Sequence, residues 1–299
     1  MKRSLEFALA WLSVKFLELL PRTAARAFGS FVACLAYTLR PPLRRAGLIN
    51  LRIAFPDWTD ARRRLLLRDL ARHLGWMAAE LVHLHDLDRT SIDRVVIPDG
   101  FENFAAAHHR GKGVLYLTGH MGAWELGPPA QALYGFPLHF LVRPLDNPRV
   151  DALVNRYRCF SGNVPVDKTN SVRTVLRVLR SGGAVGILFD LNALPGEGVF
   201  VDFFGVPACT TTGLARLALQ TDAAVVPSYC YWDRDLRKYR LRFEPALELL
   251  RTGDLDADVR ANTQRFTRVI EDFARRHPDQ WLWVHKRWKT RPPGHPPIY

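Results

Sequence analysis

The sequence predicts an α/β fold in which helices flank a central, mostly parallel β-sheet and an α-helical, membrane-associated part precedes it. From about residue 95 onward, short aliphatic runs alternate with helical segments, as in successive strand–helix units. Before that point the apolar residues fall in helical segments. The chain has 299 residues, which is enough for one substantial core.

The amino-terminal part is predicted to hold two apolar helices and one amphipathic helix. The apolar segments run from Phe7 to Val14 and from Ala27 to Leu39, and Pro41-Pro42 ends the second. A helix from Asp60 to about His85 follows, with Thr59 as its N-cap. We expect residues 1–45 to associate with membrane and residues 46–299 to form the α/β domain.

Six strands are predicted after this region, because each is a short aliphatic run bounded by turn residues. They are Val114–Leu117, Leu138–Val142, Ala184–Phe189, Val199–Phe203, Ala224–Tyr229 and Tyr239–Phe243. Helices are expected between or after them, from Gly122 to Leu133, from Pro148 to about Phe160 with Asn147 as cap, up to Arg180, from Thr212 to Thr221, and from Asp256 to Arg276.

Basic charge is concentrated at the amino end. The chain carries 42 Lys and Arg against 29 Asp and Glu, a net charge of +13, and residues 1–75 hold 14 of the former and 5 of the latter. Neither apolar segment reaches the roughly 20 residues of a spanning helix. We therefore expect both helices to lie in the headgroup layer of a membrane. The alternatives are that they cover a soluble core, or that the first one spans the bilayer.

An acidic partner is implied by the net charge, and it could be a nucleic acid, an anionic bilayer or an acidic protein. Near the carboxyl end, residues 281–291 interleave tryptophans with basic residues. This pattern fits a nucleic-acid platform, an interfacial aromatic belt or an edge strand. Because the sequence contains no recognisable nucleic-acid-binding module, we expect no nucleic-acid partner. The four scattered cysteines indicate reduced thiols.

His120 and Glu125 form the most informative pair of the sequence. His120 follows the predicted strand Val114–Leu117, and open α/β sheets bind ligands at the carboxyl ends of their strands. An imidazole oriented by a nearby carboxylate is a candidate general base. A surface ion pair or a turn histidine would explain the same residues. No second His or Cys lies nearby at metal-ligand spacing, so we expect no metal.

Other catalytic motifs are missing from the sequence. There is no Gly-x-Ser-x-Gly elbow and no Gly-x-Gly-x-x-Gly after the first strand, which argues against a serine hydrolase and a dinucleotide fold. Arg143 and Asp190, like His120, stand at predicted strand ends, so the three are expected to share a cleft. Arg156 and Arg158, on the helix after Pro148, do not share a helix face, so one of them could point inward and clamp a phosphate or a carboxylate. Both could instead line a solvated or membrane-facing surface.

Taken in order along the chain, these residues resemble the bacterial lipid A secondary acyltransferases, within the glycerolipid acyltransferase superfamily. The resemblance covers nearly the whole chain. It is carried by Asn50-Leu51 and Ala54-Phe55-Pro56, Gly119-His120 and Trp124-Glu125-Leu126, Arg143-Pro144, Asp146-Asn147-Pro148, Arg158, Asp190, Val201–Ala208, Thr211-Thr212-Gly213, Ala215-Arg216 and the closing segment Pro278–Pro292. Residues 191–195 depart from the usual family wording.

The resemblance implies an O-acyltransferase in which His120 deprotonates a lipid hydroxyl and Glu125 fixes the imidazole. The acyl donor would be a thioester of acidic acyl carrier protein or of coenzyme A, with no other cofactor and no metal. The acceptor would be an anionic lipid A precursor or a related glycolipid. Arg158 would face the reacting centre or an acceptor phosphate, while Arg143 and Asp190 would organise the cleft. The protein would work on the cytoplasmic face of the bacterial inner membrane.

Three other functions remain compatible with the sequence. The chain could acylate another membrane glycolipid or a lysophospholipid. It could hydrolyse the thioester as a thioesterase. It could also bind membranes without catalysis, although the intact His120 and Glu125 argue against this alternative.

Overall fold

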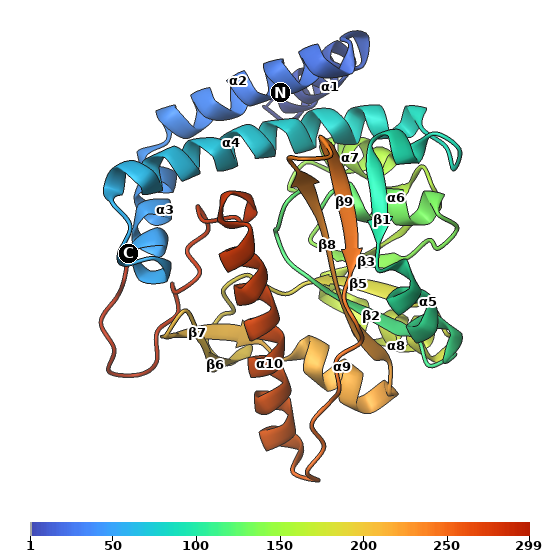
Figure 1. Cartoon of the computed structure of the whole chain (residues 1–299), viewed down its shortest axis with the longest axis vertical. Coiled ribbons are helices and arrows are strands. Elements are labelled where there is room, and N and C mark those ends of the chain that lie inside the picture. The colour runs from blue at the N-terminus through green and yellow to red at the C-terminus, as the bar shows by residue number, and fades with distance from the viewer. Residues whose placement is uncertain (1) are drawn as a thin grey trace.

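The computed structural model describes residues 2–299 and, at residue 170, the backbone alone. A seven-stranded sheet lies at its centre, with strand order β1-β9-β8-β2-β5-β3-β4 (Figure 1). The strands are Val96–Asp99 (β1), Val114–Thr118 (β2), His139–Val142 (β3), Val164–Asp167 (β4), Ala184–Leu188 (β5), Ala224–Asp233 (β8) and Lys238–Phe243 (β9). Neighbours are parallel except β8 and β9, which are antiparallel, and the predicted fold class is confirmed.

A separate antiparallel hairpin consists of β6 (Gly198–Phe203) and β7 (Val206–Thr211). The α-helices are Lys2–Leu19 (α1), Arg22–Leu39 (α2), Pro41–Ala54 (α3), Asp60–His83 (α4), Phe101–His109 (α5), Gly127–Leu133 (α6), Pro148–Cys159 (α7), Ser171–Arg180 (α8), Gly213–Thr221 (α9) and Leu255–Arg276 (α10). Short 3-10 helices span Leu84–Asp86, Ile92–Arg94, Lys168–Asn170 and Pro278–Gln280. The expected caps form, since Thr59 accepts from the amide of Arg62 and Asn147 from that of Arg149.

Both faces of the sheet are buried, as the alternation of side chains along β2 shows. Val114 and Tyr116 belong to an apolar cluster that includes Phe104 of α5. Leu115 and Leu117 belong to a second cluster, built with helices α8, α9 and α10. Successive residues of a strand point to opposite faces, so a continuous apolar run is what a sheet covered on both sides requires.

Helices α2 and α4 cross at very close range in the amino-terminal part. A Cβ atom placed on Gly75 would lie 2.2 Å from the carbonyl oxygen of Gly29, so only glycines allow this approach. Further along the crossing, Arg22 and Arg26 both bind the fully buried carboxylate of Glu80. The backbone contact and the ion pairs together fix α2 to α4.

Helices α1 and α2 expose many large apolar side chains. These are Leu5, Leu9, Trp11, Leu12, Phe16, Leu19, Phe28, Phe31, Val32, Leu35 and Leu39. Along residues 2–299 no helix, the first included, combines the length and apolarity needed to cross a membrane. The predicted boundary near residue 45 stays a prediction, and residue 1 lies outside the described part of the chain. In Figure 1, α1, α2 and α4 occupy one end of the molecule, and α8 and α9 lie towards the other.

The aromatic segment near the carboxyl end differs from every predicted form. After the 3-10 helix Pro278–Gln280 it continues without regular structure rather than as an edge strand, apart from one bridge between Trp281 and Met121. Trp281, Trp283 and Trp288 are each at most 1% exposed. These rings are core residues, because they pack against Phe203 and Phe204 at the end of the β6–β7 hairpin. They are therefore not an exposed aromatic belt or platform.

Candidate active site

His120 lies in an irregular loop between β2 and α6, and the predicted helix from Gly122 is wrong in its start. Gly122 has φ +58°, and a Cβ there would lie 2.2 Å from the carbonyl oxygen of Cys230. Its amide donates to the carbonyl of Gln280 at 2.6 Å, and the amide of Ala123 donates to that of Cys230 at 2.6 Å. These long-range backbone bonds hold the start of the loop in a non-helical conformation, so α6 begins only at Gly127.

The structure brings His120 and Asp190 together. Nδ1 of His120 lies 2.9 Å from Oδ1 of Asp190, and the backbone amide of His120 donates to Oδ2 of the same carboxylate at 2.9 Å. The two residues follow β2 and β5, which are parallel neighbours and end at the same edge of the sheet. A Cβ on Gly119 would lie 2.8 Å from Cγ of Asp190, so this glycine makes room for the carboxylate.

The Asp190 carboxylate fixes the protonation of the imidazole. An ionised carboxylate only accepts hydrogen bonds, so Nδ1 carries the proton and Nε2 keeps its lone pair. Among the described residues, no protein atom hydrogen-bonds Nε2. The side chain of His120 is 16% exposed and that of Asp190 is 1% exposed. An oriented imidazole with a partly accessible, unprotonated Nε2 has the arrangement of a general base.

Charges around the pair act in opposite directions on its two members. Burial lowers the pKa of His120, but the charge and hydrogen bond of Asp190, with a smaller contribution from Glu125, raise it above its ordinary value. Burial raises the pKa of Asp190, whereas His120 and the guanidinium of Arg287 lower it, and the net shift is downward. Asp190 therefore remains ionised beside an imidazole that binds a proton readily.

Glu125 does not orient His120, which corrects the expectation from the sequence. Its two carboxylate oxygens accept from Nε and Nη2 of Arg158 at 2.7 and 2.6 Å. Nδ1 of His120 is already bound by Asp190, so the imidazole has no second N–H for Glu125. Burial lowers the pKa of Arg158, but the bond to Glu125 outweighs it and the pKa is raised. The pair is a bidentate ion pair beside the imidazole.

Arg143 lies apart from this cluster. It follows β3, which is separated from β2 by β5, and its side chain is 84% exposed. The nearest carboxylate is that of Asp146, 3.5 Å away and itself 94% exposed. The predicted cleft thus contains His120 and Asp190, with Glu125 and Arg158 nearby, but not Arg143.

The carboxyl-terminal segment completes the site. Nε1 of Trp281 donates to Oδ2 of Asp190 at 3.0 Å, and the amide of Leu282 donates to the carbonyl of His120 at 3.1 Å. Nε2 of His285 accepts from the amide of Asn192 at 3.0 Å. Burial lowers the pKa of His285 to about 4, so its ring is neutral and can accept this bond. One segment therefore holds the loops of both His120 and Asp190.

Arg287 is a buried cation beneath this arrangement. It is 1% exposed and donates to the carbonyl oxygens of Cys209 at 2.8 Å and Leu191 at 3.3 Å, and to the hydroxyl of Thr210. Burial lowers its pKa to about 10, so it keeps its positive charge near neutral pH. Its contact with Leu191 ties it to the residue that follows Asp190.

Comparison with known proteins identifies the family. The family model of the bacterial lipid A biosynthesis acyltransferases matches residues 2–290. The chain belongs to this family, and it is an acyltransferase. Relatives include the lipid A biosynthesis lauroyltransferase of Escherichia coli, 29% identical over 304 residues (97% of this chain and 94% of the relative). The lipid A biosynthesis palmitoleoyltransferase of the same organism is 27% identical over 264 residues (87% and 84%). A lipid A biosynthesis acyltransferase of Haemophilus influenzae is 25% identical over 292 residues (95% and 88%).

In this family member, sequence reasoning missed the roles of Trp281, His285 and Arg287. The segment is a dense run of aromatic and basic residues in the sequence, but the platform and the belt require exposed rings and an edge strand buries only half of its side chains. The only local signal was three tryptophans in eight residues, an apolar content unusual for a solvated basic surface. Within residues 2–299, excepting the side chain of residue 170, no three His, Cys, Asp or Glu side chains are grouped as metal ligands would be.

Proposed function

We propose that this acyltransferase moves a fatty acyl group from an acyl thioester to a hydroxyl of a lipid A precursor, with His120 as general base. The observation that carries the proposal is the pairing of His120 with Asp190 at the carboxyl edge of the sheet. The choice of acceptor is supported by the family and by the relatives, whose names specify lauroyl and palmitoleoyl transfer in lipid A biosynthesis.

The reaction begins at Nε2 of His120, which accepts the proton of the acceptor hydroxyl. The oxygen attacks the thioester carbonyl, and the tetrahedral intermediate collapses by breaking the carbon–sulfur bond. The departing thiolate receives the proton back from the imidazolium, so protons balance over the cycle. Asp190 is a positioning residue that holds the required tautomer and stabilises the imidazolium. General base catalysis of this kind contributes roughly 10²–10⁴-fold.

Arg158 binds substrate in this proposal, supported by its geometry. Glu125 occupies Nε and Nη2, which leaves Nη1 without a hydrogen-bond partner among the described residues. The ion pair holds the guanidinium plane fixed, and Nη1 then donates to a phosphate of the acceptor or to the oxygen of the thioester carbonyl. Arg143, exposed at the rim, contributes charge for the anionic acceptor.

The donor is a thioester of acyl carrier protein or of coenzyme A, and the net charge of +13 suits either anionic partner. The exposed apolar side chains of α1 and α2 rest on the cytoplasmic face of the inner membrane, where the acceptor is found. Peripheral binding of this kind needs no spanning helix.

Mass spectrometry of lipid A tests the proposal in cells with the gene, without it, and with His120→Ala. We expect one acyl group to be missing both in the deletion and in the variant, since the variant lacks the base. Glu102→Gln, a substitution at an exposed position, is the matched control for expression of a variant protein. Normal acylation by a folded His120→Ala protein would contradict the mechanism. Free fatty acid without acylated lipid, in a purified assay, would instead indicate a thioesterase.

A further inference from the structure

Helix α8 has an unusually uniform charge. Between Asp167 and Asp190 the sequence contains no acidic residue but includes Lys168 and three arginines of α8. Arg173, Arg177 and Arg180 are spaced by four and three residues, so they share one side of the helix. All three are exposed, while Val175, Val178 and Leu179 on the other side are buried.

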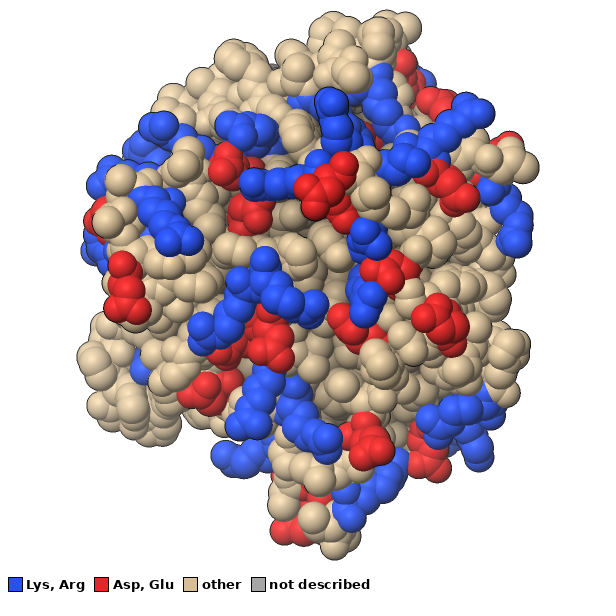
Figure 2. All heavy atoms as spheres, viewed as in Figure 1, with Lys and Arg blue, Asp and Glu red and all other residues tan. Residues whose placement is uncertain are grey.

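These arginines have no acidic partner inside the protein. No carboxylate of the described residues lies within 4.0 Å of their guanidinium nitrogens, whereas many other arginines are paired. On the face shown in Figure 2, basic and acidic side chains lie side by side, as such pairing produces. Like charges at this spacing repel one another, so exposure to solvent does not by itself account for three arginines on one helical face.

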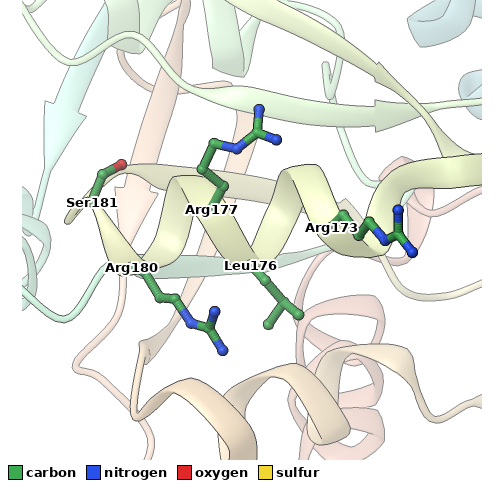
Figure 3. A pocket seen from close by; sticks show the side chains of 5 residues that line it. All are labelled: Arg173, Leu176, Arg177, Arg180 and Ser181. Carbon is green, nitrogen blue, oxygen red and sulfur yellow. The ribbon is translucent and has the colours of Figure 1, made fainter.

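The arginines surround a shallow hollow with an apolar residue. It has a volume of about 570 Å³ and is lined by Arg173, Leu176, Arg177, Arg180 and Ser181. Figure 3 looks onto this side of the helix, with Arg177 at its upper margin and Leu176 and Arg180 at its lower margin. Separate cations around one half-buried aliphatic side chain match a protein partner with several carboxylates better than a single small anion.

The position of α8 allows a partner there to reach the active site. The helix starts just after β4, at the edge of the sheet where β5 leads to Asp190 and β2 to His120. Arg173 in its first turn is therefore on the same edge as the imidazole. Figure 1 shows α8 well away from α1 and α2, so a soluble protein can approach while those helices contact lipid.

We propose that this face of α8 docks the acidic carrier protein that presents the acyl group as a thioester. The inference rests on the proposed function and specifies its donor. Carboxylates of the carrier pair with Arg173, Arg177 and Arg180, and an apolar carrier side chain packs on Leu176. A flexible thioester arm then crosses the rim to His120. Coenzyme A, which has no protein surface, makes no use of this face.

The test compares two purified triple variants of the full chain in neutral detergent. One carries Arg173→Glu, Arg177→Glu and Arg180→Glu. The control carries Arg237→Glu, Arg260→Glu and Arg268→Glu, which are also exposed and unpaired among the described residues, so the net charge changes equally. Initial rates are measured with an acyl carrier protein thioester and with an acyl-pantetheine thioester, which is neutral and lacks the protein.

For the α8 variant we expect KM for the carrier thioester to rise about tenfold or more at low salt, with weaker salt dependence than in the parent. Its rates with acyl-pantetheine should stay within about twofold of the control, which also shows that it is folded. Equal KM values for the two variants would overturn the docking site while leaving acyl transfer intact. Equal loss with both donors would overturn it as well. If the parent protein transfers no acyl group to the lipid from either thioester, the proposed function itself fails.

Discussion

His120 is the proposed general base, and two carboxylates raise the pKa of its imidazole. Asp190 bonds directly to its Nδ1, and Glu125 acts through space. Arg287 acts on Asp190, and it lies in the buried layer formed by the carboxyl-terminal segment. Each neighbour can be changed separately, so each contribution is measurable.

Asp190→Asn should lower kcat by roughly 10²–10⁴-fold, because the amide can hold the wrong tautomer and cannot stabilise the imidazolium. The proposed mechanism requires neutral His120, so kcat/KM should rise with pH through the pKa of the imidazole. In the parent that pKa is raised, and without the carboxylate it falls, which moves the rising limb to lower pH. A pH profile of kcat/KM checks this. An unmoved limb with a normal kcat would contradict the assignment of Asp190.

The same shifts have consequences for folding stability. Because the pKa of His120 is raised, its protonation stabilises the folded state at pH values below the pKa of the imidazole in the unfolded chain. This stabilisation is lost as the pH rises through the pKa of His120 in the folded protein. Because the pKa of Asp190 is lowered, its ionised form stabilises the folded state at pH values above the pKa of the carboxyl group in the unfolded chain. This stabilisation is lost as the pH falls through the pKa of Asp190 in the folded protein. The two effects overlap between the two unfolded pKa values, so the pair is most stabilising in mildly acidic solution.

Arg287→Met should disturb the pair without touching the substrate. Removing the charge raises the pKa of Asp190. The carbonyl of Leu191 loses this donor and that of Cys209 keeps the amide of Ala193, which costs about 1–3 kcal/mol. We expect a lower melting temperature and a shifted pH profile of kcat/KM. Arg287→Lys retains the charge, so it should restore the pH profile of kcat/KM more fully than it restores the melting temperature. A purely structural role would change the melting temperature alone.

At the level of elements, the crossing of α2 and α4 depends on backbone contact rather than side-chain packing. Helical glycine normally destabilises a helix by about 1 kcal/mol relative to alanine, so Gly29 and Gly75 are retained for their shape. The buried Glu80 adds an ionic tie to Arg22 and Arg26 at the same interface. These contacts join α2 firmly to α4.

Gly75→Ala should destabilise the protein by about 1–3 kcal/mol despite the better helix propensity of alanine. The new Cβ would lie 2.2 Å from the carbonyl oxygen of Gly29, and backbone cannot move aside as a side chain can. Gly47→Ala is the matched control, because its Cβ would meet only the terminal methyl groups of Leu67, the nearer at 2.7 Å. Denaturant titration of both variants gives the comparison. Equal stability of the two would show that α2 can shift on α4.

Across the whole molecule, exposed apolar side chains and unpaired arginines lie towards opposite ends. Helices α1 and α2 carry the exposed apolar side chains, and α8 carries the unpaired arginines near the opposite end (Figure 1). Under the proposed function, this separation would let the protein hold the lipid acceptor and receive the donor from different sides.

Replacing Leu9, Leu12 and Phe31 by Ser should reduce binding to vesicles that contain phosphatidylglycerol by about tenfold or more, since each loses apolar contact with lipid. Flotation of protein with vesicles measures the bound fraction. Leu236, Leu250 and Leu255, which are also exposed but lie elsewhere, supply the control when replaced by Ser. Equal binding by the two variants would remove α1 and α2 as the lipid-binding surface.

Elements that depend on local patterns could be predicted from the sequence. Thr59 and Asn147 mark helix starts because capping involves residues two or three positions apart. The aliphatic run before His120 predicts β2 because both faces of that strand are buried. The family was also evident, since its motifs occur in order along nearly the whole chain.

The carboxylate that binds His120 could be identified only from the three-dimensional structure. Glu125 is five residues away but is bound by Arg158, whereas Asp190 is 70 residues away and arrives because β5 pairs with β2. Trp281, a further 91 residues along, reaches the same carboxylate. Local spacing carries no information on strand order or on which distant segment packs over a loop, because those follow from burial of the whole core. The pairing of His120 with Asp190 therefore follows from the order of the strands and not from local spacing.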